Sequence, residues 1–308
     1  MSLTSKFSKL FRGKKVAHQV GLAFRHDALA VCYATDQGDY HYHQFPVTNG
    51  DQLAALEQFA SEGKLSAEGH LVLAPAQYQI VQVDKPNVPT DEILSALKWQ
   101  IKDLVTIPPE EMILDYFSGP TLSGGAEKIN VVVSTKSALQ AIVEKMSGSI
   151  VELTTISTEE FAFASLVPFQ EHAVLLVCQQ PNEEVVILIV KHGRIFFHRR
   201  LRGYAQLASK TMEELSFGAI DSLSLEIQRS SDYFERQLKQ APIKEIQVIL
   251  PIKTQNYIVT KLAENTNTPV NAFVFSEQHQ DKAMYAAAIG ASQLASSQTS
   301  SEEQVTHD

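Results

Sequence analysis

The chain carries one pattern twice: three short strand-like runs joined by tight turns and followed by helical sequence. The runs of the first half lie near Val16–Phe24, Ala28–Thr35 and Tyr40–Pro46. Those of the second half lie near Ala173–Gln179, Val185–Lys191 and Ile195–Leu201. Short runs rich in β-branched and aromatic residues, bounded by turn residues, predict antiparallel meanders. A meander that occurs twice and leads into helices and further strands predicts an α/β protein made of two duplicated domains.

Further elements follow each predicted meander. In the first half these are a helix and two strands, at Gln52–Ser61, Leu71–Ala74 and Gln79–Val83. In the second half they are long helical sequence, a strand and a last helix, at about Tyr204–Lys239, Ile246–Leu250 and Lys282–Leu294. The two halves therefore share an order of elements, which supports the duplication.

Composition excludes several classes of protein. A length of 308 residues is enough for two domains with separate cores. A net charge of −9 argues against a general nucleic-acid binder, which needs a basic surface. No run approaches the roughly 18 apolar residues of a membrane span, and no secretory signal begins the chain, so we expect a cytoplasmic protein. Cys32 and Cys178 lie in apolar runs and are expected to be buried, reduced thiols.

The segment Asp91–Phe117 predicts a helix, a proline stop and a strand. Apolar residues recur at helical spacing, with Thr90 as a candidate N-cap and Pro108-Pro109 ending the run. The spaced residues are Leu94, Leu97, Ile101 and Leu104. A new apolar strand then opens at Asp115.

The two ends of the chain differ in charge. Residues 1–15 interleave cations with apolar side chains, namely Lys6, Phe7, Lys9, Leu10, Phe11, Arg12, Lys14 and Lys15. On a helix the apolar residues share one face, so this segment fits an anionic membrane surface, and equally a solvated terminus. Residues 296–308 are polar and serine-rich, which predicts a disordered tail.

Three stretches of sequence together resemble the PilM family, actin-like cytoplasmic proteins of type IV pilus assembly. These are DEILSALKWQIKDLVTIPPEEMILDYF, EIQRSSDYFERQ and YAAAIGAS, in that order along the chain. The resemblance implies an actin-like ATPase fold, with duplicated ribonuclease-H-like domains and an inserted small subdomain. It places the first domain at 16–168, with the insertion around 75–150, and the second domain at 169–295.

The same resemblance locates a nucleotide site and suggests that it is degenerate. Actin-like folds hold ATP between two hairpins, each with an Asp-x-Gly pattern, and beside a glycine pair. The corresponding positions here carry Gly21 and Ala23, Val177 and Gln179, and Pro251 and Ile252. Without the carboxylates and glycines, phosphate and metal lose their partners, so we expect no cofactor and no catalysis. The alternative is an ATP-binding protein whose nucleotide site uses other residues.

Family resemblance also implies a partner. PilM proteins hold the cytoplasmic N-terminal peptide of a bitopic, PilN-like inner-membrane protein in a groove of the first domain. We expect Trp99, Lys102 and Tyr116 to lie near that groove, with core packing of Trp99 as the alternative. The implied protein is peripheral on the inner membrane, and a pilus assembly ATPase stays open as a further partner. Type II secretion components share the fold, but they usually continue into a transmembrane helix, which this sequence lacks.

Other motifs carry little chemistry. The glycine-rich Leu122–Ala126 is similar to the signature loop of ABC transporters, but the sequence has no G-x-x-x-x-G-K-[ST] phosphate-binding loop to accompany it. We therefore expect a hairpin turn. His41 and His43 point to one side of a predicted strand, but the sequence places no third metal ligand nearby. The basic run His198–Arg202 predicts a solvated strand end, with contact to an acidic partner or a phospholipid head group as the alternative. No G-x-S-x-G elbow appears, and we expect no catalytic residues.

Overall fold

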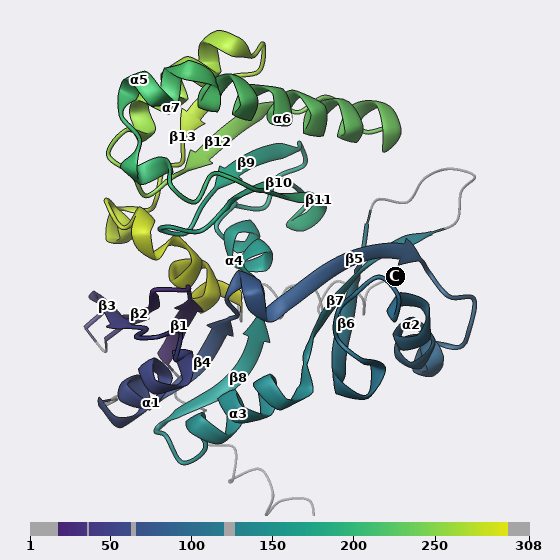
Figure 1. Ribbon diagram of the computed structural model, residues 1–308. Helices are drawn as coiled ribbons and strands as arrows, with labels where there is room; N and C mark the ends of the chain where they lie inside the picture. The colour runs from purple at the N-terminus through teal and green to yellow at the C-terminus, as the bar shows by residue number, and fades with distance from the viewer. Residues whose placement is uncertain (1–17, 36, 63–65, 120–126, 295–308) are drawn as a thin grey trace, which may run out of the picture.

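The computed structural model describes residues 18–35, 37–62, 66–119 and 127–294. Two five-stranded sheets lie one above the other in Figure 1, with helices between them, and a three-stranded sheet lies to one side. The basic segment 1–15, the predicted tail 296–308 and the glycine-rich stretch 122–126 lie outside the described residues. The chain is therefore a mixed α/β protein, as predicted.

The first sheet has the strand order β3-β2-β1-β4-β8. β1, β2 and β3 form the predicted antiparallel meander, and β4 and β8 extend it as parallel strands. The strands are β1 His18–Phe24, β2 Ala28–Ala34, β3 Tyr40–Pro46, β4 Ala67–Val72 and β8 Val151–Ser157. Two helices, α1 Gln52–Glu62 and α3 Lys136–Met146, bury Leu56 and Ile142 against one face of this sheet.

The second sheet repeats this arrangement, with the order β11-β10-β9-β12-β13. Its strands are β9 Val174–Cys178, β10 Val185–Lys191, β11 Arg194–Leu201, β12 Glu245–Ile249 and β13 Val270–Ala272. β9, β10 and β11 are antiparallel, whereas β12 and β13 are parallel to β9. Two helices, α6 Ile220–Asp232 and α7 Gln255–Asn265, cover its outer face (Figure 1). The two sheets thus share one topology, which confirms the predicted duplication.

Two helical segments, α4 Glu159–Ser165 and residues 286–294, pack between the sheets in one apolar cluster. Close approach here depends on two glycines. A Cβ on Gly290 would lie 1.8 Å from the carbonyl oxygen of Ala162, and one on Gly21 would lie 1.8 Å from that of Ala288. Real Cβ atoms do not make such contacts, so both positions require glycine.

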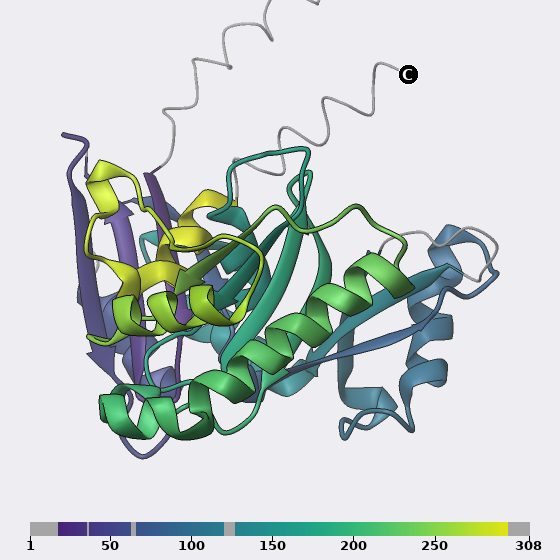
Figure 2. The same cartoon turned by 90° about the horizontal axis from the view of Figure 1, so that it is seen from above.

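The third sheet has the order β5-β7-β6 and is inserted between β4 and α3. Its elements are β5 Tyr78–Asp84, α2 Ile93–Ile101, β6 Met112–Ser118 and β7 Lys128–Thr135. α2 buries Ile93, Leu97 and Ile101 against the sheet, which gives this unit a core of its own. It stands apart from the other two sheets in Figure 2.

Two predicted helix boundaries were wrong. Thr90 is not an N-cap but begins a short 3-10 turn, and α2 ends at Ile101, so that Leu104 lies exposed in the turn that follows. The helix can end there because Val105 and Ile107 reach the same core from the non-helical connection to Pro108. The apolar residues that continue after Ile101 therefore do not indicate a longer helix.

The long helix expected over Tyr204–Lys239 is interrupted. Phe217 and Gly218 have non-helical dihedral angles, with φ of 102° at Gly218, and they separate α5 Met212–Glu214 from α6. Glycine adopts this left-handed conformation without steric cost. Upstream, Leu207–Ser209 forms a separate 3-10 turn.

Candidate functional site

The β1–β2 hairpin turns at Arg25, His26 and Asp27. Gly21 and Ala23, which we aligned with the Asp-x-Gly pattern, lie inside β1 and ahead of that turn. Both are buried, Gly21 against the helix 286–294 and Ala23 in the cluster between the sheets. Gly21 therefore serves helix packing, and the turn itself is formed by Arg25, His26 and Asp27.

The β9–β10 hairpin is filled by one of its own side chains. Val177 is buried within β9, and Gln179, the next predicted position, is 2% exposed. Its Nε2 donates to the carbonyl oxygens of Glu183 at 2.6 Å and Tyr204 at 2.9 Å. These bonds place a bulky amide in the loop where a glycine would leave room for backbone to approach a phosphate.

The two hairpins contact each other directly. The backbone N–H of His26 donates to Oε1 of Glu183 at 2.7 Å, and the side-chain amide of Asn182 donates to Oδ2 of Asp27 at 3.0 Å. Arg25 Nε lies 2.8 Å from Oδ1 of the same carboxylate. Burial would raise the pKa of Asp27, but hydrogen bonds from Asn182 and Arg25 outweigh it and lower the pKa. Hydrogen bonds between protein groups thus join the two hairpins where they meet.

A buried ion cluster lies beside this bridge. Arg200 of β11 forms ion pairs with both Glu159 and Glu160 in the first turn of α4, the second at 2.8 Å. Tyr78 of β5 donates to Glu160 at 2.7 Å, and Gln180 of the second hairpin donates to Glu159 at 2.8 Å. The cluster therefore ties together the inserted unit, α4 and the second sheet.

Electrostatics of this cluster depend on burial. Glu159 and Glu160 are almost inaccessible to solvent. Burial raises the pKa of Glu159, and the Arg200 guanidinium opposes that rise. Because each carboxylate has a cationic partner and a further donor, the ion set is internally satisfied. The prediction of a solvated strand end is wrong for Arg200, because its guanidinium is paired with the buried carboxylates of Glu159 and Glu160. These partners lie some 40 residues earlier in the sequence.

The third predicted nucleotide position follows β12. Pro251 and Ile252 occupy it, with the N–H of Ile252 donating to the carbonyl of Leu250 at 2.8 Å. Ile252 packs against the outer core of the second sheet. Gln255 caps the preceding backbone by accepting from the N–H of Leu250 at 2.7 Å. Here too a side chain occupies space that a glycine pair would leave open.

The predicted partner residues are only partly together. Trp99 is 68% exposed, which decides against core packing, because it lies opposite the face of α2 that carries Leu97 and Ile101. Lys102 Nζ lies 5.8 Å from the indole centroid. Tyr116 is half-buried and lines a separate cavity of about 450 Å³, together with Lys85, Val88, Ile93 and Glu127. The structure therefore pairs Trp99 with Lys102 and sets Tyr116 apart.

Other candidate chemistry is limited. Cys32 and Cys178 are buried free thiols, as predicted, and burial raises the pKa of Cys32 to about 12. Among the described residues no group of three His, Cys, Asp or Glu could hold a metal, and His41 and His43 stack with Tyr33. No helix in the described ranges is long and apolar enough to span a membrane.

Comparison with solved structures identifies the fold. The chain superposes on the PilM–PilN type IV pilus biogenesis complex with a TM-score of 0.68 and 14% identity, covering 90% of this chain and 98% of that one. The chain has the actin-like ATPase fold. A protein of that fold and unknown function from Bacteroides thetaiotaomicron matches with a TM-score of 0.50 and 10% identity, covering 90% and 98% of the two chains.

A third solved structure belongs to a secretion system. The cytoplasmic domain of EpsL, an inner-membrane component of the type II secretion system of Vibrio cholerae, matches with a TM-score of 0.50 and 12% identity. The match covers 81% of this chain and 94% of that one. No family model and no curated protein matches the sequence. At these identities the likeness establishes the fold, and the function is argued from the site.

Proposed function

We propose that this protein is a non-catalytic, cytoplasmic scaffold of a type IV pilus assembly machine. The observation that carries the proposal is the direct contact between the two hairpins, from His26 to Glu183 and from Asp27 to Asn182. In an actin-like fold those hairpins hold phosphate from opposite sides. Here each hairpin donates a hydrogen bond to a carboxylate of the other hairpin. A bound nucleotide would have to break these protein hydrogen bonds.

Charge supports the same conclusion. Asp27 and Glu183 place carboxylates at the bridge, where they would repel the like charge of a triphosphate, and the adjacent Arg25 guanidinium is already paired with Asp27. Arg200, a nearby cation, is committed to Glu159 and Glu160. If a nucleotide used Arg200 as its cation, these pairs would break and leave buried carboxylates without a cation.

The proposed partner is the cytoplasmic N-terminal peptide of a PilN-like inner-membrane protein. Likeness to PilM in its complex with PilN supports this partner. On this chain the inserted unit offers two features for a peptide: the cavity at Tyr116 and the exposed Trp99 with Lys102 beside it. Within the PilM family the sequence looks most like MshI of mannose-sensitive haemagglutinin (MSHA) pilus biogenesis. We therefore assign the protein to an MSHA-type machine. The basic residues 1–15 would hold it against the inner membrane.

Two measurements test this proposal. Isothermal titration of the full chain with magnesium-ATP is expected to give no binding heat, whereas micromolar affinity would overturn the non-catalytic role. Titration with synthetic N-terminal peptides of PilN-like proteins encoded nearby is expected to give saturable binding, weakened in Tyr116→Ala. A matched control is Tyr257→Ala, on the outer helix α7. If no such peptide binds, the proposed partner is excluded.

A second candidate function is that of a type II secretion component, which the likeness to cytoplasmic EpsL favours. The two candidates differ in the membrane protein that co-purifies with the chain. Cross-linking in the native host, followed by identification of the captured inner-membrane protein, separates them. Capture of a secretion protein in place of a PilN-like one would support the second candidate.

A further inference from the structure

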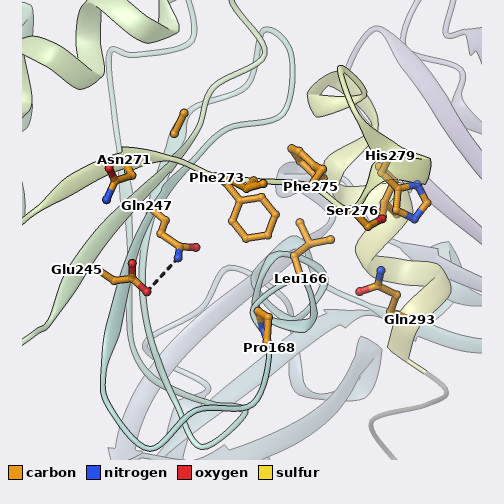
Figure 3. Close-up of a pocket in the computed structure, with 13 residues that line it drawn as sticks. Leu166, Pro168, Glu245, Gln247, Asn271, Phe273, Phe275, Ser276, His279 and Gln293 are labelled. Carbon is orange, nitrogen blue, oxygen red and sulfur yellow. Dashed lines mark hydrogen bonds between the residues drawn. The ribbon is translucent and has the colours of Figure 1, made fainter.

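A second cavity, of about 440 Å³, lies at the opposite end of the second sheet from the hairpins (Figure 3). Glu245 at its wall is the first residue of β12, whereas the hairpin follows the last residue of the parallel strand β9. One side of the cavity is apolar, with Leu166 and Pro168 after α4 and Phe273 and Phe275 after β13. No residue of the proposed nucleotide or partner site lines it.

The other side of this cavity carries acceptor oxygens. Gln247 Nε2 donates to Oε1 of Glu245 at 3.0 Å, and Figure 3 shows the two side chains next to each other on the same wall. Gln247 Oε1 is buried and has no hydrogen-bond partner among the described residues. The ion pair of Glu245 with His172 is long, at 3.8 Å. The cavity therefore suits an occupant that joins an apolar side chain to a hydrogen-bond donor or cation.

The chain enters the fold near this cavity. β1 packs against the helix 286–294, since a Cβ on Gly21 would lie 2.7 Å from the backbone nitrogen of Ser292. Gln293, the next residue, lines the cavity. His18 begins β1 only a few residues ahead of Gly21. An extended chain spans roughly 3.3 Å per residue, so the residues before His18 have ample length to reach the cavity.

We propose that this cavity receives the chain's own basic N-terminal segment, with Phe11 on the apolar side and Arg12 toward Glu245 and Gln247. Residues 6–15 alternate apolar and cationic side chains, which matches a cavity that is apolar on one side and acidic on the other. While docked, the segment is withheld from a membrane surface, so docking and membrane contact are mutually exclusive states of the same residues.

Photo-cross-linking of the full chain tests this occupant. With benzoylphenylalanine in place of Phe11, irradiation of a dilute solution is expected to join this position to Pro168, Phe273 or Val274 within one molecule. Val274 is 87% exposed at the rim, so Val274→Lys leaves the core intact while it places a cation beside the docked segment. The cross-link yield should fall about tenfold, the effect of roughly 1.4 kcal/mol of lost binding energy.

A matched control is Val143→Lys, which adds the same cation at an exposed position of α3 far from the cavity and should keep the yield. Thermal unfolding of each variant checks that the fold is retained. Cross-links that join two molecules, with a yield that rises with concentration, would replace the proposed occupant by a second copy and overturn the proposal. Cross-links mapped outside the cavity, or equal yield in Val274→Lys, would overturn it as well.

Discussion

The side-chain amide of Asn182 donates to Oδ2 of Asp27 at 3.0 Å, although 155 residues separate them in the chain. The bond joins the turn of the first hairpin to that of the second, and Asp27 also holds Arg25, whose side chain is buried. One carboxylate therefore both joins the two hairpins and neutralises the buried Arg25 guanidinium. Its removal and the removal of Asn182 should have different consequences.

Asp27→Ala is expected to lower the free energy of unfolding by about 2–3 kcal/mol, because it leaves the buried Arg25 guanidinium without its ion partner. Asn182→Gly should cost less than about 1 kcal/mol, since it removes one partly exposed hydrogen bond. Glycine suits the position, where φ is 59°. Urea unfolding monitored by circular dichroism measures both values.

The control for this pair is Asp39→Ala, at an exposed turn next to β3, which should stay within about 0.5 kcal/mol of the parent chain. Equal losses in Asp27→Ala and Asn182→Gly would contradict the double role assigned to Asp27.

Arg200 supplies the second prediction. Arg200→Ala leaves Glu159 and Glu160 buried without a cation and should cost about 3–5 kcal/mol at neutral pH. Burial already raises the pKa of Glu159 above its ordinary 4.5, so the folded state binds a proton more readily than the unfolded state. Acidification through that window therefore favours folding at this group. Without Arg200 the rise is larger, so Arg200→Ala should regain stability as pH falls from 8 toward 6.

The comparison variant is Arg199→Ala in the neighbouring position of β11, whose partner Glu226 is more exposed. Its cost should stay below about 1 kcal/mol, with no added dependence on pH. A melting temperature of Arg200→Ala that does not rise on acidification would argue against the buried carboxylate pair.

Gly21 stands where the Asp-x-Gly pattern of actin-like folds has its aspartate, and a substitution can test whether it serves packing instead. Gly21→Ala places a methyl group 1.8 Å from the carbonyl oxygen of Ala288, so the helix 286–294 must move. We expect a loss of about 3 kcal/mol, at the upper end of overpacking costs. Gly38→Ala, in an open turn with φ of 86°, should cost only about 1 kcal/mol of backbone strain. Similar melting temperatures for the two variants would refute the packing role.

Much of this fold was predictable from the sequence because its strands are continuous apolar runs with polar turns between them. The meander β9–β11 illustrates this, since its strands lie within a residue or two of the predicted ranges. The end of α2 was not predictable, because Val105 and Ile107 continue an apolar pattern without a helix. The site was largely hidden, since Arg200 and Asp27 meet partners that lie far away in the sequence.

His279 links the edge strand β3 to the C-terminal part of the chain and predicts a dependence of stability on pH. Its Nδ1 lies 2.6 Å from the Tyr42 hydroxyl, and Tyr40 packs edge-on against the ring. Lys282, the charged group packed on Tyr42, would repel an imidazolium. Burial lowers the pKa of His279 below 6.5, so the folded state binds fewer protons than the unfolded state and loses stability as pH falls through that range.

His279→Gln keeps a hydrogen-bonding group beside Tyr42 and removes the titration. The drop in melting temperature between about pH 7.5 and about pH 5.5 should therefore be smaller in this variant than in the parent chain. His192→Gln, in the exposed turn between β10 and β11, is the control and should leave the drop unchanged. An unaltered drop in His279→Gln would assign the acid sensitivity to other groups.

Trp99 is the single tryptophan of the chain and is exposed, so it reports on any partner that covers α2. If a PilN-like peptide spans both Trp99 and the cavity at Tyr116, its binding removes water from the indole and shifts the emission to shorter wavelength. Trp99→Ala should change stability by less than about 0.5 kcal/mol and weaken the peptide by about tenfold or more, as a central aromatic contact does. Saturable binding without an emission shift, and with unchanged affinity in Trp99→Ala, would restrict the contact to the Tyr116 cavity.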